Sequence, residues 1–313
     1  MSDYATQKPN AVSVSFVIPC YRSEKYIERV LDELYTQASQ ISLISSFETI
    51  CVIDGSPDNV ADVLERRASW DSRLVVVELS RNFGQPNAKM AGFRMADGDV
   101  VVSLDDDGQC PVDKLEALIT AVLGGADLAI ASYPKKTQSA LKNAGSKIND
   151  LMSRWVMDKP EDLRFSNFFA FSSLVRDAIK SWDKPYPYLY GLVNQISGRI
   201  VNVAMEERER KEGSSGFTFK KSLSLWLNGF TGFSIKPLRI SFLLAAVAGI
   251  AGFLCLAVSL LGESPDLGLM ASLALFSCSL NLAALGLLGE YVGRIYMLAN
   301  GKPQFIIRRR IGR

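Results

Sequence analysis

The stretch that decides the fold reads Val100-Val101-Val102-Ser103-Leu104-Asp105-Asp106-Asp107-Gly108-Gln109-Cys110-Pro111. Its first five residues carry no charge and are rich in valine, whose branched side chain packs well on a pleated sheet, so they predict a buried strand. Three carboxylates follow where that strand ends, and open α/β sheets bind their ligands at such strand ends. Because adjacent carboxylates repel one another, a divalent cation that prefers oxygen ligands would stabilise them. The alternative is a solvated acidic turn.

Alternation along the chain places Asp105 and Asp107 on one side, and Gln109 continues that set with a neutral oxygen. These three side chains are therefore the candidate ligands for Mg²⁺ or Mn²⁺. The sequence contains neither a GxGxxG motif after its first strand nor a GxxxxGK[ST] motif. Their absence disfavours a dinucleotide-dependent dehydrogenase and a P-loop nucleotidase.

Apolar, β-branched segments alternate with helical patterns on both sides of this stretch. The predicted strands are Val12–Pro19, Phe47–Ile53, Arg73–Leu79, Val100–Leu104 and Asp127–Ser132. The predicted helices begin at Ser23 and at Asn59 and cover Gln85–Met95 and Val112–Leu123. This order is typical of βαβ units in an α/β fold with a mostly parallel sheet. We expect Asp54, Arg81 and the 105–109 segment to line one crevice at the strand ends.

The composition excludes several kinds of chemistry. The chain has 313 residues and a formal net charge of +2, which argues against general nucleic-acid binding. It contains no histidine, so a Ser–His or Cys–His nucleophile, a histidine base and a histidine metal ligand are all excluded. Its five cysteines have no paired spacing, which disfavours a disulfide scaffold or a zinc site and fits a reducing compartment.

Two apolar segments lie in the C-terminal third. Residues 240–261 form a run of 22 without a charge, and residues 267–289 add 23 more. Each run exceeds the roughly 20 residues that a helix needs to cross a bilayer core. Basic flanks before the first run and after the second predict that both flanks are cytoplasmic. We therefore expect a multi-pass protein of the inner membrane; the alternative is a buried helical hairpin.

The domain organisation follows from these segments. We expect a cytoplasmic catalytic domain at 1–216, a juxtamembrane amphipathic helix at 217–236, a transmembrane hairpin at 237–295 and a basic cytoplasmic tail at 296–313. Bulky apolar residues recur at three- and four-residue spacings after Phe217, against lysines, which favours a helix in the membrane interface. The alternative is a helix that packs on the catalytic domain.

Seven segments, in order, carry a family resemblance. They are Phe16–Tyr21, Val52–Asp58, Ser80–Gln85, Asp105–Pro111, Arg210–Thr218, Phe233–Arg239 and Gly289–Tyr296. Together the chain resembles family 2 glycosyltransferases of the GT-A fold, in the branch of dolichol-phosphate mannose synthase and bacterial polyprenyl-phosphate glycosyltransferases. The chain departs from the family pattern at several positions, among them Asp106, which stands where a small residue is usual, and Gly216, which stands where lysine is frequent.

The resemblance implies an inverting transfer of one sugar from a nucleotide sugar, usually UDP-linked, to polyprenyl phosphate. It implies nucleotide binding by Pro19, Tyr21, Asp54, Arg81 and Asp105. It implies metal binding by Asp107 and Gln109 beside Asp105, and catalytic roles for Asp105, Asp107 and Arg210. It also implies lipid-phosphate binding by Arg210, Ser214, Ser215 and Arg208. The implied partners are the donor, the acceptor lipid, the bilayer and further copies of the chain.

Two other functions fit parts of the sequence. A processive polysaccharide synthase would share the catalytic domain, but Leu151 stands where the QxxRW element of such enzymes has glutamine. A non-catalytic membrane scaffold could retain a nucleotide-binding domain, although the intact 105–109 segment argues against it. The identity of the sugar cannot be read from the sequence.

Overall fold

The computed structural model describes residues 11–133, 163–182, 189–196, 198–206, 246–254, 267–301 and 303–312. The chain divides into two units. The first comprises Met1–Ser139, Pro160–Gly216 and Pro303–Arg313, and the second comprises Ala140–Lys159 and Phe217–Lys302. The strands β1–β8 belong to the first unit.

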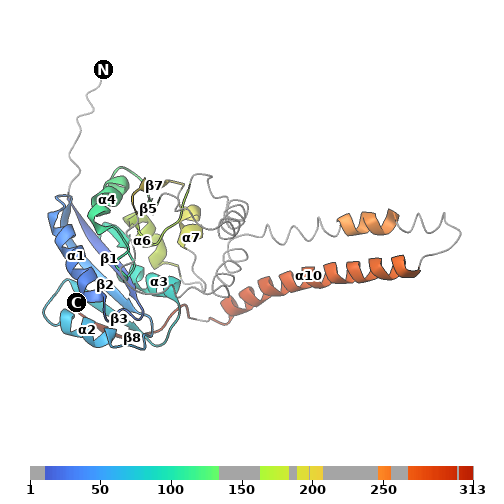
Figure 1. Cartoon of the computed structure of the whole chain (residues 1–313), viewed down its shortest axis with the longest axis horizontal. Helices are drawn as coiled ribbons and strands as arrows, with labels where there is room; N and C mark the ends of the chain where they lie inside the picture. The colour runs from blue at the N-terminus through green and yellow to red at the C-terminus, as the bar shows by residue number, and fades with distance from the viewer. Residues whose placement is uncertain are drawn as a thin grey trace, which may run out of the picture. The chain divides into compact units, whose positions relative to one another are not determined.

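A mixed sheet of eight strands forms in the described part of the first unit, in the order β7-β5-β6-β4-β1-β2-β3-β8. Figure 1 shows this sheet with the helices around it. Strands β1, β2, β3 and β4 are parallel to one another, whereas β6 and β8 run antiparallel to their neighbours. The strand bounds are β1 (Val12–Cys20), β2 (Ile44–Ile53), β3 (Leu74–Leu79), β4 (Val100–Ser103), β5 (Leu128–Ser132), β6 (Phe169–Ser172), β7 (Ile200–Ala204) and β8 (Ile307–Ile311). The expected α/β class with a mostly parallel sheet is confirmed.

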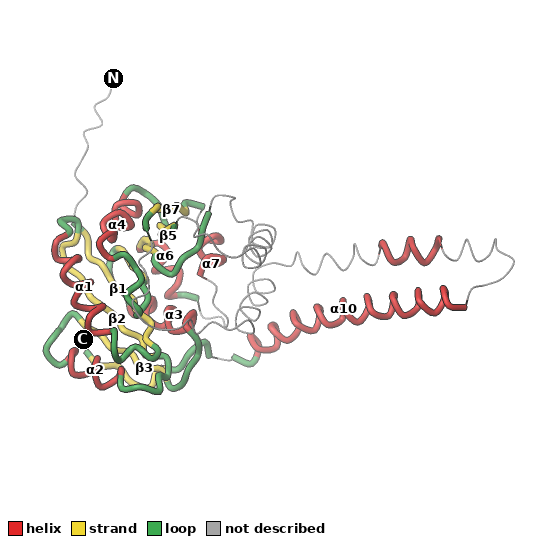
Figure 2. The backbone as a smooth tube through the Cα atoms, in the orientation of Figure 1, coloured by secondary structure: helices red, strands yellow, loops and turns green. Residues whose placement is uncertain are grey.

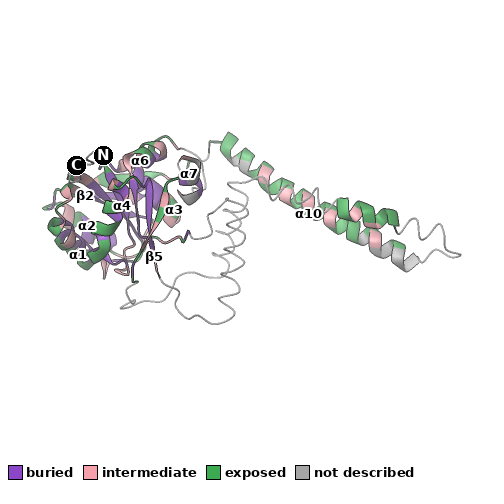
Figure 3. Cartoon of the chain, turned by 90° about the horizontal axis from the view of Figure 1, so that it is seen from above, coloured by how far each residue is buried: buried purple, intermediate pink, exposed green. Residues whose placement is uncertain are grey.

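Helices cover both faces of this sheet, and buried side chains fill the space between (Figure 3). Helices α1 (Ile27–Gln40), α2 (Val60–Ala68) and α4 (Leu115–Leu123) share one core with the sheet. Helices α3 (Gln85–Met95), α6 (Ser173–Lys180) and α7 (Leu189–Ile196) share the other. Alternate residues of each central strand point to opposite faces, so Phe16 enters the first core and Val17 the second.

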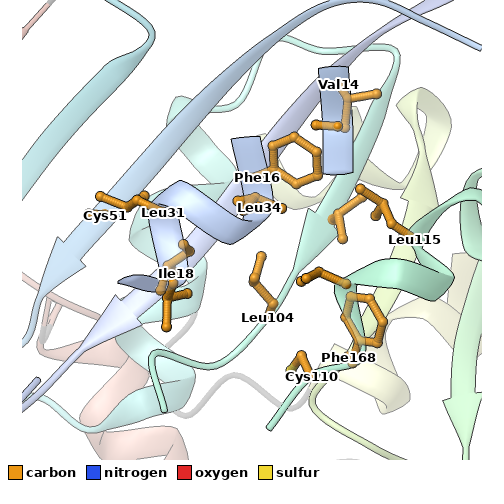
Figure 4. Close-up of a cluster of buried hydrophobic side chains, with 14 of the residues drawn as sticks. Val14, Phe16, Ile18, Leu31, Leu34, Cys51, Leu104, Cys110, Leu115 and Phe168 are labelled. Atoms are coloured by element: carbon orange, nitrogen blue, oxygen red, sulfur yellow. The ribbon is translucent and has the colours of Figure 1, made fainter. Parts of the chain in front are cut away.

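The first core reaches the segment that carries the carboxylates (Figure 4). Phe16 and Ile18 of β1 gather there with Leu34 of α1 and Leu115 of α4, and all four are fully buried. Cys110 belongs to the same cluster and lies in the turn between β4 and α4. Burial of each large apolar side chain stabilises the fold by about 1.5–3 kcal/mol. The acidic turn is therefore anchored at both ends in this buried cluster, by Leu104 before the carboxylates and Cys110 after them.

Several predicted bounds shift by a few residues. Strand β1 continues to Cys20, one residue beyond the predicted end at Pro19, and helix α1 begins at Ile27 instead of Ser23. The predicted helix from Val112 divides into a short 3₁₀ turn, η1 (Val112–Lys114), and α4. Helix α3 has the predicted bounds.

Part of the predicted basic tail at 296–313 forms a strand of the sheet. Ile307–Ile311 forms β8, which pairs antiparallel with β3 at the edge of the sheet. Arg309 donates to Glu78 at 2.5 Å and to Glu65 at 2.9 Å, so acidic residues of β3 and α2 neutralise one of the basic side chains. Pro303–Arg313 therefore belongs to the first unit.

Helix α10 (Leu267–Ala299) lies in the second unit, contains the predicted segment 267–289 and continues past it (Figure 2). Residues 246–254 of the other apolar segment are also helical. None of the helices in the described ranges meets the combined length and hydropathy expected of a membrane crossing. The expected helix at 217–236 lies outside the described residues.

Candidate active site

The carboxyl ends of the parallel strands meet at one edge of the sheet, as the sequence predicts. The register pairs Cys20 with Ile53, and Ile53 with Glu78, so β1, β2 and β3 end side by side. Strand β4 joins them on the other side of β1. The polar residues that follow these ends are Tyr21, Asp54, Arg81 and the 105–109 segment.

Asp105, directly after β4, is held by donors from distant parts of the chain. Gln85 Nε2 of α3 donates to Asp105 Oδ1 at 2.8 Å, and Asn167 Nδ2, before β6, donates to Oδ2 at 3.0 Å. Lys89 Nζ lies 3.6 Å from Oδ1. Protein donors thus contact both oxygens, which indicates that Asp105 organises the site. Its predicted contacts with metal and nucleotide stay predictions.

Asp107 and Gln109 lie in the turn that follows, and both are partly exposed. The backbone N–H of Gln109 donates to Asp107 Oδ1 at 3.1 Å, and Gly108 between them has a φ of +74°. One carboxylate and one amide oxygen fit a Mg²⁺ or Mn²⁺ ion that completes its shell with diphosphate oxygens and water. In the described ranges, no three acidic, cysteine or histidine side chains form a metal cluster of their own. These two residues remain candidate ligands together with Asp105.

Asp106 connects the acidic turn to the loop after β1. Its Oδ2 accepts the backbone N–H of Tyr21 at 3.0 Å. Burial raises the pKa of Asp106 to about 6. Arg22, next to Tyr21, takes a left-handed conformation with a φ of 59°, and its N–H donates to Ser56 Oγ at 2.7 Å. Asp106, to which the sequence assigns no role, therefore fixes the loop beside the candidate metal ligands.

Asp54 fixes a second loop. It is 3% exposed, and it accepts the backbone N–H groups of Phe83 at 2.6 Å and Gly84 at 2.8 Å. Burial raises the pKa of Asp54, and the two N–H groups oppose that rise. Gly55 has a φ of +56° and lies against the backbone of residues 81 and 82. These contacts give Asp54 a structural role, and its contact with a nucleotide base stays a prediction.

Tyr21 and Arg81 are exposed at the same edge and remain candidates for nucleotide contact. The Arg22 guanidinium lies 5.5 Å from the Tyr21 ring, and the Arg81 guanidinium lies 4.7 Å from the Phe83 ring. Pro19 is buried within β1 opposite Val52, and its contribution to a base pocket stays a prediction.

The predicted lipid-phosphate residues lie outside the described ranges: Arg208, Arg210, Ser214 and Ser215. The sequence motifs assign no role to Gln85, and they do not indicate that Lys89 and Asn167 lie beside Asp105. No local motif marks the last two residues, because α3 and the segment before β6 reach Asp105 only through the tertiary fold.

Comparisons with known proteins agree with this fold. The profile of glycosyl transferase family 2 matches residues 15–177. An undecaprenyl-phosphate 4-deoxy-4-formamido-L-arabinose transferase of Proteus mirabilis (strain HI4320) is 31% identical over 98% of this chain and 95% of its own length. The transferase of the same name from Pectobacterium carotovorum subsp. carotovorum (strain PC1) is 30% identical over 96% and 94%.

Solved structures share the fold. Mannosyl-3-phosphoglycerate synthase from Rubrobacter xylanophilus matches with a TM-score of 0.52 and 17% identity over 69% of this chain and 71% of its own. Glucosyl-3-phosphoglycerate synthase from Mycobacterium tuberculosis, in complex with Mn²⁺, UDP-glucose and phosphoglyceric acid, gives 0.51 and 17% over 70% and 80%. The chain belongs to glycosyltransferase family 2 and is an enzyme that transfers glycosyl groups. The resemblance predicted from its motifs is confirmed.

Proposed function

We propose that this enzyme transfers a single sugar from a UDP-linked donor to a polyprenyl phosphate, with undecaprenyl phosphate as the first acceptor to test. The observation that carries the proposal is the likeness to undecaprenyl-phosphate sugar transferases along nearly the whole chain. The oxygen-rich turn at the end of β4 supports it. A nucleotide-sugar donor carries a charged diphosphate, and open α/β sheets bind their ligands at the carboxyl ends of the strands.

The donor would bind at the edge formed by β1 to β4. Asp107 and Gln109 would hold Mg²⁺ or Mn²⁺, which neutralises charge on the leaving diphosphate when it is bound. The structure of glucosyl-3-phosphoglycerate synthase, which shares the fold, contains Mn²⁺ together with UDP-glucose, so this metal and this nucleotide are the first to test. Tyr21 and Arg81 would contact the nucleotide, and Asp105 would hold α3 and the segment before β6 beside it through Gln85 and Asn167.

The acceptor phosphate would attack the anomeric carbon of the donor sugar directly and invert its configuration. A lipid phosphate is already ionised near neutral pH, so the reaction needs no strong general base, in agreement with a chain that has no histidine. Catalysis would then depend on positioning two phosphates and on stabilising charge in the transition state. Arg208, Arg210, Ser214 and Ser215 would bind the lipid phosphate.

The segments at 240–261 and 267–289 would anchor the enzyme in the inner membrane, with 217–236 at its cytoplasmic surface. Their length without charged residues supports this arrangement. Because β8 pairs with β3, the chain that leaves the catalytic unit after Gly216 returns to the same unit at Pro303. Such a return requires an even number of crossings, which is consistent with a hairpin and with a catalytic unit and tail on one side.

Transfer can be tested with the purified full-length chain in detergent. The protein is incubated with undecaprenyl phosphate, Mg²⁺ or Mn²⁺ and a panel of UDP-sugars, and the lipid is analysed by mass spectrometry. We expect one lipid molecule to gain one sugar mass with one donor. A polymeric product would favour a processive synthase, and a chain that binds no nucleotide would favour a scaffold.

A further inference from the structure

A buried lysine lies beside the proposed donor site. Lys89 is on the second turn of α3, and its side chain is only 8% exposed. Its ammonium lies 3.6 Å from Asp105 Oδ1 and 5.4 Å from the centre of the Phe169 ring. A charged ammonium loses favourable hydration when it is buried, so such a position needs a compensating interaction.

The described residues compensate the lost hydration of this ammonium only in part. Lys89 Nζ is inaccessible to solvent and has no hydrogen-bond partner among the described residues. The nearest carboxylate already accepts hydrogen bonds from Gln85 and Asn167, and the 3.6 Å separation from Asp105 is that of an ion pair without a hydrogen bond. Lys89 therefore retains the capacity to donate to a further oxygen.

The surroundings indicate which kind of oxygen this would be. Asp107 and Gln109, the candidate ligands for the metal and its diphosphate, follow Asp105 by two and four residues. Three consecutive carboxylates would repel a phosphate group, and Lys89 supplies positive charge 3.6 Å from Asp105 Oδ1. Lysine binds phosphate as a compact point charge with three donors.

We propose that Lys89 donates to a phosphate oxygen of a substrate, either in the donor diphosphate or in the lipid phosphate; this inference rests on the proposed function. Before the substrate binds, Asp105 balances the charge of the ammonium and Phe169 covers it. Because Nζ is inaccessible to solvent in this arrangement, the flexible side chain of Lys89 turns toward the substrate on binding, and the phosphate oxygen then supplies the missing acceptor. Lys89 is therefore a substrate-binding residue that the motifs of the family did not indicate.

The test compares Lys89→Met, which keeps the length of the side chain, with Lys89→Arg, which keeps the charge. Lys180→Met is the matched control, because Lys180 pairs with Asp97 near the start of β4, at the opposite end of that strand. Titration calorimetry on the full chain in detergent measures the affinity for UDP with Mn²⁺ and for uridine. Kinetics measure the KM for the active UDP-sugar and for undecaprenyl phosphate.

We expect Lys89→Met to lower kcat/KM by about 10- to 100-fold, which is the loss of one charged hydrogen bond, and Lys89→Arg to retain more activity. A weaker affinity for UDP with unchanged uridine binding would place the contact on the donor diphosphate. An unchanged UDP affinity with a raised KM for the lipid would place it on the acceptor phosphate. Either result supports the proposal.

Two results would overturn it. The first is kinetics and UDP affinity within twofold of the wild type and of Lys180→Met. The second is an equal loss of UDP and uridine affinity together with a lower melting temperature, which would mean that Lys89 only supports Asp105. The binding measurements require no transfer, so a wild-type enzyme that binds UDP but glycosylates no lipid would contradict the proposed acceptor without deciding the role of Lys89.

Discussion

Replacement of Gly55 by alanine should test how closely the two loops at the strand ends are joined. Gly55 follows Asp54 and has a φ of +56°. A Cβ atom at this position would overlap the backbone nitrogen of Asn82 and lie 2.5 Å from the carbonyl carbon of Arg81. The substitution therefore acts on the loop whose N–H groups bind Asp54.

The magnitude follows from three contributions. The left-handed conformation costs a residue with a side chain about 1–2 kcal/mol. Forcing extra volume into a packed site costs about 1–3 kcal/mol. Alanine also reduces the entropy of the unfolded chain, which offsets about 0.4–1 kcal/mol. We expect a net loss of about 1–5 kcal/mol, centred on about 3 kcal/mol, in the free energy of unfolding.

Gly125→Ala is the matched control, because Gly125 has a φ of +102° but nothing lies within 4 Å of its added Cβ. It carries the conformational strain without the overlap, so it should cost only about 1 kcal/mol. Thermal unfolding followed by circular dichroism should separate the two variants, at about 2–4 °C per kcal/mol for a domain of this size. Equal losses in both variants would refute the close approach of the loops.

Asp107→Asn should lower sugar transfer by more than about 100-fold and leave the melting temperature unchanged, which parallel activity and unfolding assays would check. Arg210→Ala should raise the KM for undecaprenyl phosphate more than the KM for the nucleotide sugar. The Arg73 guanidinium holds the pKa of buried Asp71 below its usual value. The stability that this pair contributes is present above the unfolded pKa of about 4 and is lost as the pH falls through the lower folded pKa. Asp71→Asn should therefore cost about 1–3 kcal/mol at neutral pH and flatten the acid-induced loss measured by urea unfolding.

Local signals predicted the elements that depend on local chemistry. Helix α3 has the expected bounds because Gly84, with a φ of +91°, ends the preceding loop and Pro86 fits the first turn. The valine run was recognisable as β4 because stiff, branched side chains favour a buried strand. Helix α1 begins at Ile27, after a turn in which the backbone carbonyl of Ser23 accepts from Tyr26 and Ile27.

The remaining features depend on contacts between distant residues. The sequence of β8 predicts only a basic tail, because its partner strand β3 lies more than 200 residues earlier. Glu78 and Glu65 neutralise Arg309 only in the folded protein. Asp105 reads as an exposed ligand because the sequence does not reveal that Gln85 and Asn167 converge on it. The strand ends indicated the place of the site, whereas the partners within it required the structure.

The pairing of β8 with β3 also affects how the protein folds during its synthesis on the ribosome. The outer edge of β3 stays unpaired until residue 311 has been made, since β8 follows the whole segment from 217 to 302. An unpaired strand edge can pair with another chain and start aggregation. A ribosome that stalls between residues 217 and 302 would leave the nascent protein with an open sheet. In normal synthesis, too, the two apolar segments leave the ribosome before β8 can close the sheet.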